Sequence, residues 1–282
     1  MDPLPRLTDD GLLTPEVGDW AEEKYQHVRY YADLFARSMS KKWKNRAYVD
    51  LFAGAGRSRI RGMTSILPAS PTIALGLPFT RYVFCEGDPK KLYALTQRRR
   101  RDFDKSRAWF VSGDVNEATD EILAQLPVPS DGGLLTFCLV DPYAMSNLRF
   151  ETIRRLSERW IDFLVLVPSG QDFQRWREEK YMDPADRVVE EFLGDPNWRK
   201  AWHVFPKQDR KNGASEFIAD RFGQQMASLG FIYKGLDVAR VVRSTDKNLL
   251  LYHLLLFSRK ELGASFWKTT LDNVNPQREL GF

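Results

Sequence analysis

The sequence contains few of the residues that build disulfide frameworks or metal sites. Among its 282 residues there are two cysteines, Cys85 and Cys138, and three histidines, His27, His203 and His253. Two cysteines cannot form a disulfide framework or a four-cysteine zinc site, and the histidines are too far apart for common ligand spacings. Both cysteines fall within apolar segments, so we expect inert core thiols and no metal cofactor.

Long apolar segments and targeting signals are also missing. The longest apolar runs, residues 134–140 and 249–257, are far shorter than the roughly 20 residues that span a bilayer. The N-terminus has no basic stretch followed by an apolar one, which argues against secretion. With 43% hydrophobic and 28% charged residues, the composition is that of a folded chain. We therefore expect a cytoplasmic globular protein that does not bind membranes, and the oligomeric state stays open.

Charge is nearly balanced, with 42 Lys and Arg against 38 Asp and Glu, a net charge of +4. Basic residues nevertheless cluster at residues 41–46, at Arg57, Arg59 and Arg61, and at residues 98–101. Such a run is more often a solvated face than a nucleic-acid site, because local distribution matters more than the sum. The cluster at residues 57–61 follows a glycine-rich turn, so it is the one that could steer phosphates.

Short apolar runs alternate with amphipathic segments along the first two thirds of the chain. Continuous apolar strands between helices predict a doubly wound α/β fold with a mostly parallel sheet. We expect strands at residues 46–52, 81–86, 109–114, 134–140 and 161–167, and helices at residues 20–43, 90–101, 116–126 and 150–159.

The final third has a different pattern. After a helix at residues 215–229, two strand-like runs, residues 231–242 and 249–258, predict an antiparallel hairpin that completes a sheet of about seven strands. Residues 170–212 predict a helical insertion near the site mouth, whose Trp176, Trp198 and Trp202 are more often packing residues than a stacking platform. The chain then divides into an arm and helix (1–45), a core (46–169), the insertion, and a closing unit (213–282), with the first 15 or so residues lying over the body.

The ends of the predicted strands carry the strongest functional signal, since open parallel sheets bind ligands beyond the carboxyl ends of their strands. The glycines of the segment 50–56 allow close backbone approach, and its leading Asp50 can order the turn or take an ammonium group. Glu86 is placed to accept both hydroxyls of a ribose, and Asp114 to accept from an adenine amino group. Each alone is weak, because a strand-end carboxylate is often only a helix cap and Ile60 replaces the third glycine of the dinucleotide pattern. Together, in sheet order, they match the adenosine and methionine parts of S-adenosylmethionine (SAM).

Three segments resemble motifs of class I SAM-dependent methyltransferases, namely residues 50–56 (DLFAGAG), 86–90 (EGDPK) and 141–143 (DPY). The chain is also similar to the three-Cys-motif partner protein family (TcmP), over residues 14–268. This similarity lies in residues 20–24, 70–75, 252–258, 263 and 266–268. It implies a methyltransferase-like fold and a radical-SAM-like partner protein. It also implies cofactor contacts by Asp50, Phe52, Gly54, Gly56, Glu86 and Asp114.

The fourth strand end, Asp141-Pro142-Tyr143, resembles the Asp-Pro-Pro-Tyr signature of adenine amino-methyltransferases with one proline fewer. In that signature the acid and a nearby backbone carbonyl accept hydrogen bonds from the exocyclic amine, and the aromatic ring stacks on the flipped base. The resemblance implies that Asp141, Pro142 and Tyr143 are catalytic. The alternative is that Asp141 merely caps the next turn.

Our leading hypothesis is a SAM-dependent methyltransferase that modifies a base of DNA or RNA at an exocyclic amine, with Arg57, Arg59 and Arg61 contacting phosphates. A rival is a non-catalytic protein of the same fold that binds a three-Cys-motif radical-SAM-like protein or nucleic acid. A third option is a methyltransferase of small-molecule or protein amines. The sequence contains neither a G-x-x-x-x-G-K-[ST] loop nor a nucleophile elbow, which removes the common phosphate-loop and serine-hydrolase alternatives.

Overall fold

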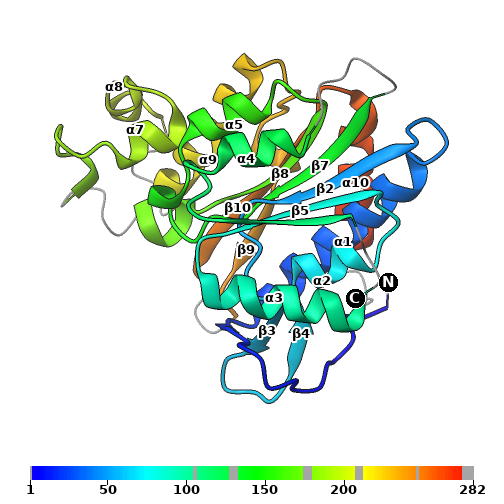
Figure 1. The fold of residues 1–282 in the computed structure, drawn as a ribbon. Coiled ribbons are helices and arrows are strands. Elements are labelled where there is room, and N and C mark those ends of the chain that lie inside the picture. The colour runs from blue at the N-terminus through cyan, green and yellow to red at the C-terminus, as the bar shows by residue number, and fades with distance from the viewer. Residues whose placement is uncertain are drawn as a thin grey trace, which may run out of the picture.

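A seven-stranded sheet forms the centre of the computed structural model, which describes residues 2–103, 107–126, 133–173, 180–206, 212–245 and 248–274 (Figure 1). The strand order is β6-β5-β2-β7-β8-β10-β9, and β10 runs antiparallel to both neighbours while the other neighbouring pairs are parallel. This confirms the doubly wound class I methyltransferase fold. The strands are β2 (Asn45–Asp50), β5 (Arg81–Glu86), β6 (Ala108–Ser112), β7 (Leu134–Val140), β8 (Ile161–Val167), β9 (Arg240–Arg243) and β10 (Leu250–Phe257).

The central strands are continuously apolar because both faces of the sheet are covered. In β7, Phe137 and Leu139 pack into one hydrophobic cluster and Cys138 and Val140 into the other. Both β7 and β8 begin and end where the sequence predicts. Cys138 and Cys85 are buried and form no disulfide, as expected for core thiols.

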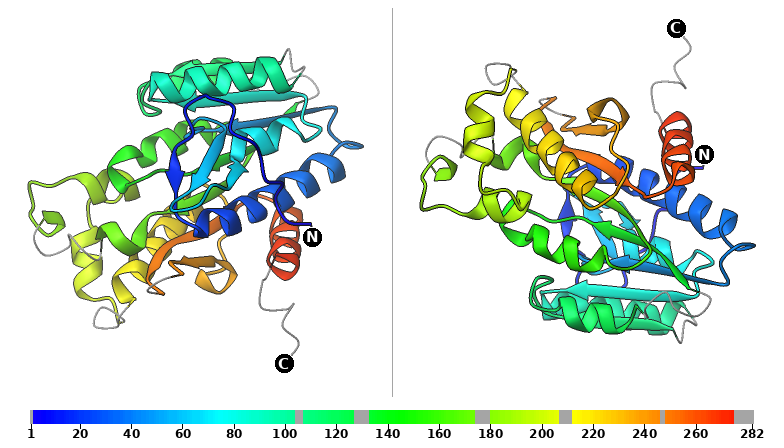
Figure 2. Two further views of the ribbon diagram at one scale, coloured as in Figure 1. Left: turned by 90° about the horizontal axis from the view of Figure 1, so that it is seen from below. Right: turned by 90° about the horizontal axis from the view of Figure 1, so that it is seen from above.

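Helices cover the two faces, as Figures 1 and 2 show. Side chains of α1, α2, α3 and α10 join one cluster, and those of α4, α5, α7, α8 and α9 join the other. The bounds are α1 (Trp20–Ser38), α2 (Ser70–Leu75), α3 (Pro89–Asp102), α4 (Thr119–Ala124), α5 (Phe150–Leu156), α7 (Val188–Leu193), α8 (Trp198–His203), α9 (Gly213–Ser228) and α10 (Glu261–Asn273). Shorter turns of helix are η1 (Met145–Asn147), η2 (Ser169–Phe173) and η4 (Leu236–Val238).

The closing hairpin is shorter than predicted. The pairing of β9 with β10 is antiparallel as expected, but the strand predicted over residues 231–242 is reduced to Arg240–Arg243. Gly235, at φ +86°, leaves the extended conformation, and the one-turn helix η4 follows it directly. The apolar residues before β9 therefore pack by their side chains, Phe231 on Phe163 of β8 and Tyr233 on Phe257 of β10, instead of pairing as a strand.

A second, small sheet was not predicted. It contains β1 (Glu16–Val17), β3 (Arg57–Ile60) and β4 (Ile66–Pro68), in the order β1-β3-β4. The N-terminal arm runs across β3 and β4, where Leu7 bridges to Ile66 and Leu4 is buried (Figure 2). The arm thus lies over the body, as predicted.

The described part of the segment after β8 contains η2, α7 and α8 joined by turns, and α7 packs against η1. Trp198 and Trp202 are buried, in contact with the ring of Phe173, so packing is their role here. The third tryptophan, Trp176, lies outside the described residues. The division into arm, core, insertion and closing unit stays a prediction, and described residues from all four parts contribute to the two hydrophobic clusters.

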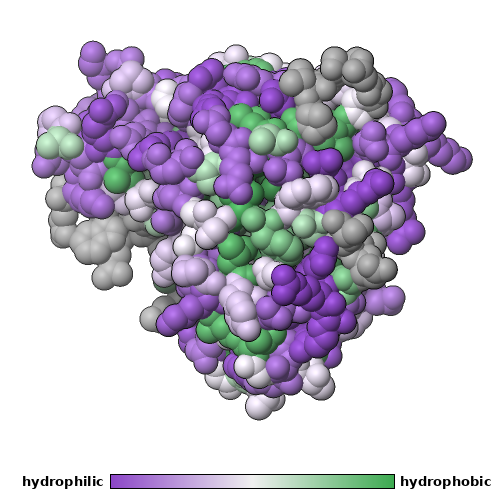
Figure 3. Space-filling view, in the orientation of Figure 1, coloured by the Kyte–Doolittle hydropathy of each residue, from purple (hydrophilic) through white to green (hydrophobic). Residues whose placement is uncertain are grey.

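Hydrophilic side chains cover most of the face seen in Figure 3, and apolar side chains gather in a strip at its centre. Within the described residues, no helix is both long enough and apolar enough to cross a bilayer. Tyr143, at 96% relative exposure, is the most exposed of the large hydrophobic side chains in the described part of the chain.

Candidate active site

The strand-end acids come together at one edge of the sheet. Asp50 ends β2 and Glu86 ends β5, whereas Asp114 and Asp141 follow β6 and β7. These four strands are neighbours in the order β6-β5-β2-β7 and all run parallel. Their carboxyl ends therefore form a continuous acidic edge, where doubly wound folds bind ligands.

The two glycines of the turn after β2, Gly54 and Gly56, have different roles. Gly56, at φ +82°, has no room for a side chain, because an added Cβ would lie 2.8 Å from Leu95 Cδ1 and 3.1 Å from Thr72 Oγ1. At Gly54, at φ +64°, an added Cβ would meet nothing within 4 Å. Gly56 thus packs the turn onto α2 and α3, while Gly54 leaves its backbone open to a ligand.

Glu86 ties this turn to the end of β5. Its Oε2 accepts from the backbone N–H of Gly54 at 2.7 Å, and its Oε1 accepts from the N–H of Asp88 at 2.9 Å. The residue is half-buried, and each carboxylate oxygen has a second lone pair. Glu86 can therefore hold the turn and still accept from the hydroxyls of a ribose.

Asp50 is fully buried, and its contacts are internal. Its carboxylate accepts from the N–H of Phe52 at 3.3 Å and from the hydroxyl of Tyr48 at 3.4 Å. Burial raises the pKa of Asp50 to about 7; the Ser70 hydroxyl opposes this shift, and the charge of Asp141 adds to it. The sequence left two roles open for Asp50, ordering the turn or binding an ammonium group, and this geometry supports the first.

Asp114 is exposed and belongs to a polar junction that sequence reasoning missed. Its carboxylate accepts from the backbone N–H and the side-chain amide of Asn116, at 2.8 and 2.9 Å. The amide oxygen of Asn116 accepts from Arg149 N–H at 2.8 Å and from the Thr152 hydroxyl at 2.9 Å. Asn116 thereby links the loop after β6 to the segment that follows Asp141. The Asp-x-Asn pattern of residues 114–116, which is typical of a turn, is the sequence signal that could have revealed this junction.

Asp141 forms an ion pair with Lys24 of α1, with Nζ 2.5 Å from Oδ2. The side chains are 12% and 21% exposed, respectively, so the pair is largely shielded from water. Pro142 is buried, and Tyr143 projects into solvent. Lys24 was not predicted as a site residue, because no motif joins two residues 117 positions apart.

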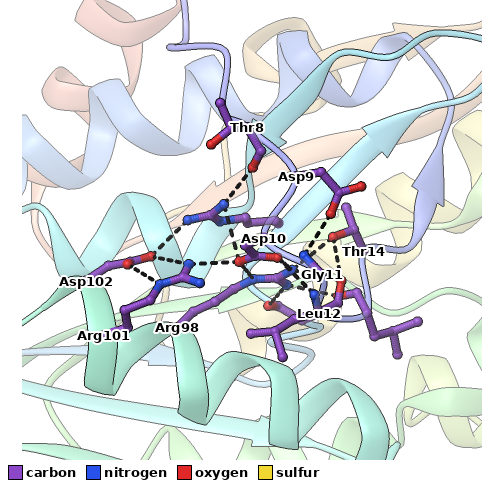
Figure 4. Close-up of polar contacts among 12 residues, drawn as sticks. Thr8, Asp9, Asp10, Gly11, Leu12, Thr14, Arg98, Arg101 and Asp102 are labelled. Carbon is purple, nitrogen blue, oxygen red and sulfur yellow. Dashed lines mark hydrogen bonds and ion pairs between the residues drawn. The ribbon is translucent and has the colours of Figure 1, made fainter.

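The arm is locked to the glycine turn by Arg98 of α3, which is 1% exposed (Figure 4). Arg98 binds both carboxylate oxygens of Asp10, at 2.7 and 2.8 Å, and also donates to the backbone carbonyl of Ala55 at 2.7 Å. Arg101 and Asp102 extend this cluster. Because Ala55 lies between the two glycines, the arm, α3 and the turn form one connected unit.

The basic residues predicted to meet phosphates have other partners. Arg57 is buried and pairs with Asp102 and Asp10, and Arg59 pairs with Asp9. They lie on β3, where the arm folds back over them. The contact of Arg57, Arg59 and Arg61 with phosphates stays a prediction. Arg61 is exposed.

The two remaining basic runs have different positions. Residues 41–44 precede β2 at the amino edge of the sheet, and Arg46 is buried within β2. Residues 98–101 lie at the end of α3, where Arg98 and Arg101 pair with Asp10 of the arm. Elsewhere, His253 is buried and hydrogen-bonded to Ser169, at 2.9 Å, and His27 to the carbonyl of Glu23. Among the described residues, no group of three His, Cys, Asp or Glu could hold a metal ion.

No protein-family model and no curated protein matches the sequence. Solved structures do match. TYW2 from M. jannaschii, in complex with AdoMet, is 10% identical with a TM-score of 0.45, over 92% of this chain and 88% of that one. Trm1 from Pyrococcus horikoshii, with S-adenosyl-L-methionine, is 11% identical with a TM-score of 0.46, over 93% and 64%. Cofactor-bound Rv0187 from MTB is 13% identical with a TM-score of 0.44, over 91% and 84%. These similarities are low, so the fold class rests on the strand order of the chain itself.

Proposed function

We propose that the protein is a SAM-dependent methyltransferase that modifies a nucleic-acid base at an exocyclic amine. One observation carries this proposal: Tyr143 presents a ring that is 96% exposed directly beyond Asp141, at the acidic edge of the sheet. An exposed ring beside a hydrogen-bond acceptor suits a planar base that carries an amine. The low-identity structures of TYW2 and Trm1, both with SAM bound, agree with the proposal.

The residues at the glycine turn fit SAM. Space lies over Gly54, where an added Cβ would have no neighbour within 4 Å. Glu86 would accept from the ribose hydroxyls, and Asp114 from the adenine amine, while Asp50 and Arg98 keep the turn in place. Bound SAM supplies an electrophilic methyl group, whose bond to sulfur breaks, leaving its electron pair on sulfur, as the bond to the amine nitrogen forms.

The protein's own contribution to transfer is alignment. Asp141 would accept an N–H of the amine and so direct the nitrogen lone pair toward the methyl group. Tyr143 would hold the base in that plane by stacking. The amine proton is released to water, so the proposal assigns no general base.

Within this class we also propose that the protein is a member of the three-Cys-motif partner family.

A non-catalytic partner of a radical-SAM-like protein is the second candidate function. One observation favours it: Asp141 and Glu86 already bind groups of the protein itself, namely Lys24 and the backbone of Gly54. Absence of SAM binding in a folded protein would select this candidate.

The test is transfer of a radiolabelled methyl group from SAM to mixed-sequence RNA and single-stranded DNA. Loss of one stacking contact costs about 1–3 kcal/mol, so we expect Tyr143→Ala to lower kcat/KM by roughly five- to a hundredfold. Asp141→Ala removes the acceptor and should abolish transfer. Tyr93→Ala, at an exposed tyrosine of α3, is the matched control and should retain activity. Equal activity of the Tyr143 and Tyr93 variants would contradict the proposal.

A further inference from the structure

The ion pair between Lys24 and Asp141 places a cation at the position where the proposed function needs an acceptor. Lys24 lies near the start of α1, and its Nζ is 2.5 Å from Oδ2 of Asp141. The Asp141 carboxylate has no second hydrogen-bond donor among the described residues. Its Oδ1 is therefore available to a ligand, whereas Oδ2 is held by the protein.

The surroundings of this pair are acidic or phenolic. Asp50 of β2 lies close enough for the charge of Asp141 to act on it. From α1 come Glu23 and Tyr25, and from β10 comes Tyr252. Glu23 is itself paired with Arg240 of β9. Lys24 is thus the cation that compensates Asp141 and Asp50 together.

Electrostatics agree with this role. Burial by itself would lower the pKa of Lys24, but the charge and hydrogen bond of Asp141 and the nearby Tyr25 and Tyr252 together outweigh burial and raise the pKa, so the ammonium stays protonated. The ammonium is therefore a fixed positive charge beside Asp141, and its charge also acts against the raised pKa of the buried Asp50.

A second observation marks the pair as a place where a ligand binds. The hydroxyl of Tyr252 is buried and has no hydrogen-bond partner among the described residues, although Lys24 and Asp141 are near enough to act on its pKa. Leaving a buried hydroxyl unpaired costs about 1–3 kcal/mol in folding. A polar ligand group beside Asp141 would supply the missing partner.

We propose that Lys24 is a positioning residue for Asp141, which it holds by Oδ2 so that Oδ1 receives the substrate amine. This proposal rests on the proposed function. It adds a residue from outside the strand-end motifs, and it gives α1 a role in the site besides covering the sheet.

The experiment uses Lys24→Gln, which keeps an N–H donor but removes the charge, and Lys24→Arg, which keeps both. Lys42→Gln, at an exposed lysine beyond the end of α1, is the matched control. The first readout needs no ligand: urea unfolding of Lys24→Gln, Asp141→Asn and the double variant measures whether the two residues stabilise the fold together. The second is kcat/KM for methyl transfer from SAM to mixed-sequence RNA and single-stranded DNA.

Asp141→Asn should lower the stability of the unmodified protein and leave that of Lys24→Gln unchanged, because the pair is then already broken. In Lys24→Gln we expect kcat/KM for the nucleic acid to fall at least tenfold, while Lys24→Arg restores it and Lys42→Gln matches the unmodified protein. Equal effects of Asp141→Asn in the two backgrounds would overturn the proposal. So would coupled stabilities with unchanged transfer, because Lys24 would then only stabilise the fold. If the unmodified protein transfers no methyl group, the proposed function fails, while the coupled stabilities still decide whether Lys24 holds Asp141.

Discussion

At the scale of single residues, the two glycines of the turn after β2 show how backbone geometry and packing combine. Both Gly54 and Gly56 have positive φ, yet only Gly56 is crowded, by Leu95 and Thr72. Positive φ alone makes a side chain costly, by of order 1 kcal/mol or more for a non-glycine residue. Crowding adds a separate cost, which a comparison with an uncrowded glycine can isolate.

We predict that Gly56→Ala destabilises the protein by about 1–3 kcal/mol more than Gly62→Ala. Gly62 has φ +73° and no atom within 4 Å of an added Cβ, so it bears the strain without the clash. Urea unfolding of the two variants measures the difference. Equal destabilisation would show that the turn can shift away from Leu95, and that Gly56 is not needed for packing.

At the scale of elements, the Arg98–Asp10 cluster connects three segments that are far apart in sequence. The arm, α3 and the glycine turn meet at one guanidinium, which also binds the carbonyls of Leu12 and Leu13. Asp10 contacts Arg98, Arg57 and Arg101, and its hydrogen bond with Arg98 holds its pKa below the usual range. Its contribution is present above pH 4 and is lost only under strong acid.

We predict that Asp10→Asn costs about 3–5 kcal/mol, because it leaves buried guanidinium charge unpaired. The neighbouring Asp9→Asn removes an exposed pair with Arg59 and should cost about 1 kcal/mol or less. Urea unfolding measures both, and amide exchange should speed up at residues 8–14 and at Ala55 in the Asp10 variant alone. Similar costs for the two variants would contradict a buried, connected cluster.

The elements that sequence reasoning predicted well are those determined by local pattern. The strands β7 and β8 are apolar at nearly every position because both faces are covered, and their bounds match the prediction. The strand β3 was missed because Arg57 and Arg59 make it polar, and it is stabilised by an arm about 50 residues away in sequence. The strand β9 was predicted too long, because Gly235 interrupts an apolar run whose Phe231 and Tyr233 pack on β8 and β10 by their side chains.

The candidate site could likewise be predicted only in part. Four strand-end acids could be predicted because sheet order alone brings them to one edge. Their hydrogen-bond partners could not be predicted, because Lys24, Asn116 and Arg98 belong to other elements. The positions of acids follow from topology, whereas their environments depend on tertiary packing.

At the scale of the whole molecule, buried carboxyls give stability an unusual pH dependence. Burial raises the pKa of Asp50 to about 7 and that of Asp162 to about 6. The folded state therefore keeps protons that the unfolded state releases above pH 4, so these groups favour folding at low pH and lose that effect as pH rises through 6 and 7. His27 and His253, whose pKa values burial lowers, act in the opposite direction.

We predict that Asp50→Asn gains stability relative to the unmodified protein as pH rises from 5 to 7, by up to about 1.4 kcal/mol per pH unit, and no further above pH 8. The difference between the two proteins isolates Asp50, since the other groups are common to both. Urea unfolding at each pH supplies the comparison. Parallel stability curves would contradict a neutral, buried Asp50.

The central claim, that the acidic edge binds SAM, is tested most directly by calorimetric titration of SAM into the unmodified protein and Glu86→Gln. Glu158→Gln, at an exposed glutamate before β8 and hence at the opposite edge of the sheet, is the control. Hydrogen bonds to a charged group contribute about 1.5–3 kcal/mol each. We therefore expect binding that weakens by roughly tenfold or more in Glu86→Gln and is unchanged in Glu158→Gln. No binding by the folded protein, or equal binding by all three, would contradict the account.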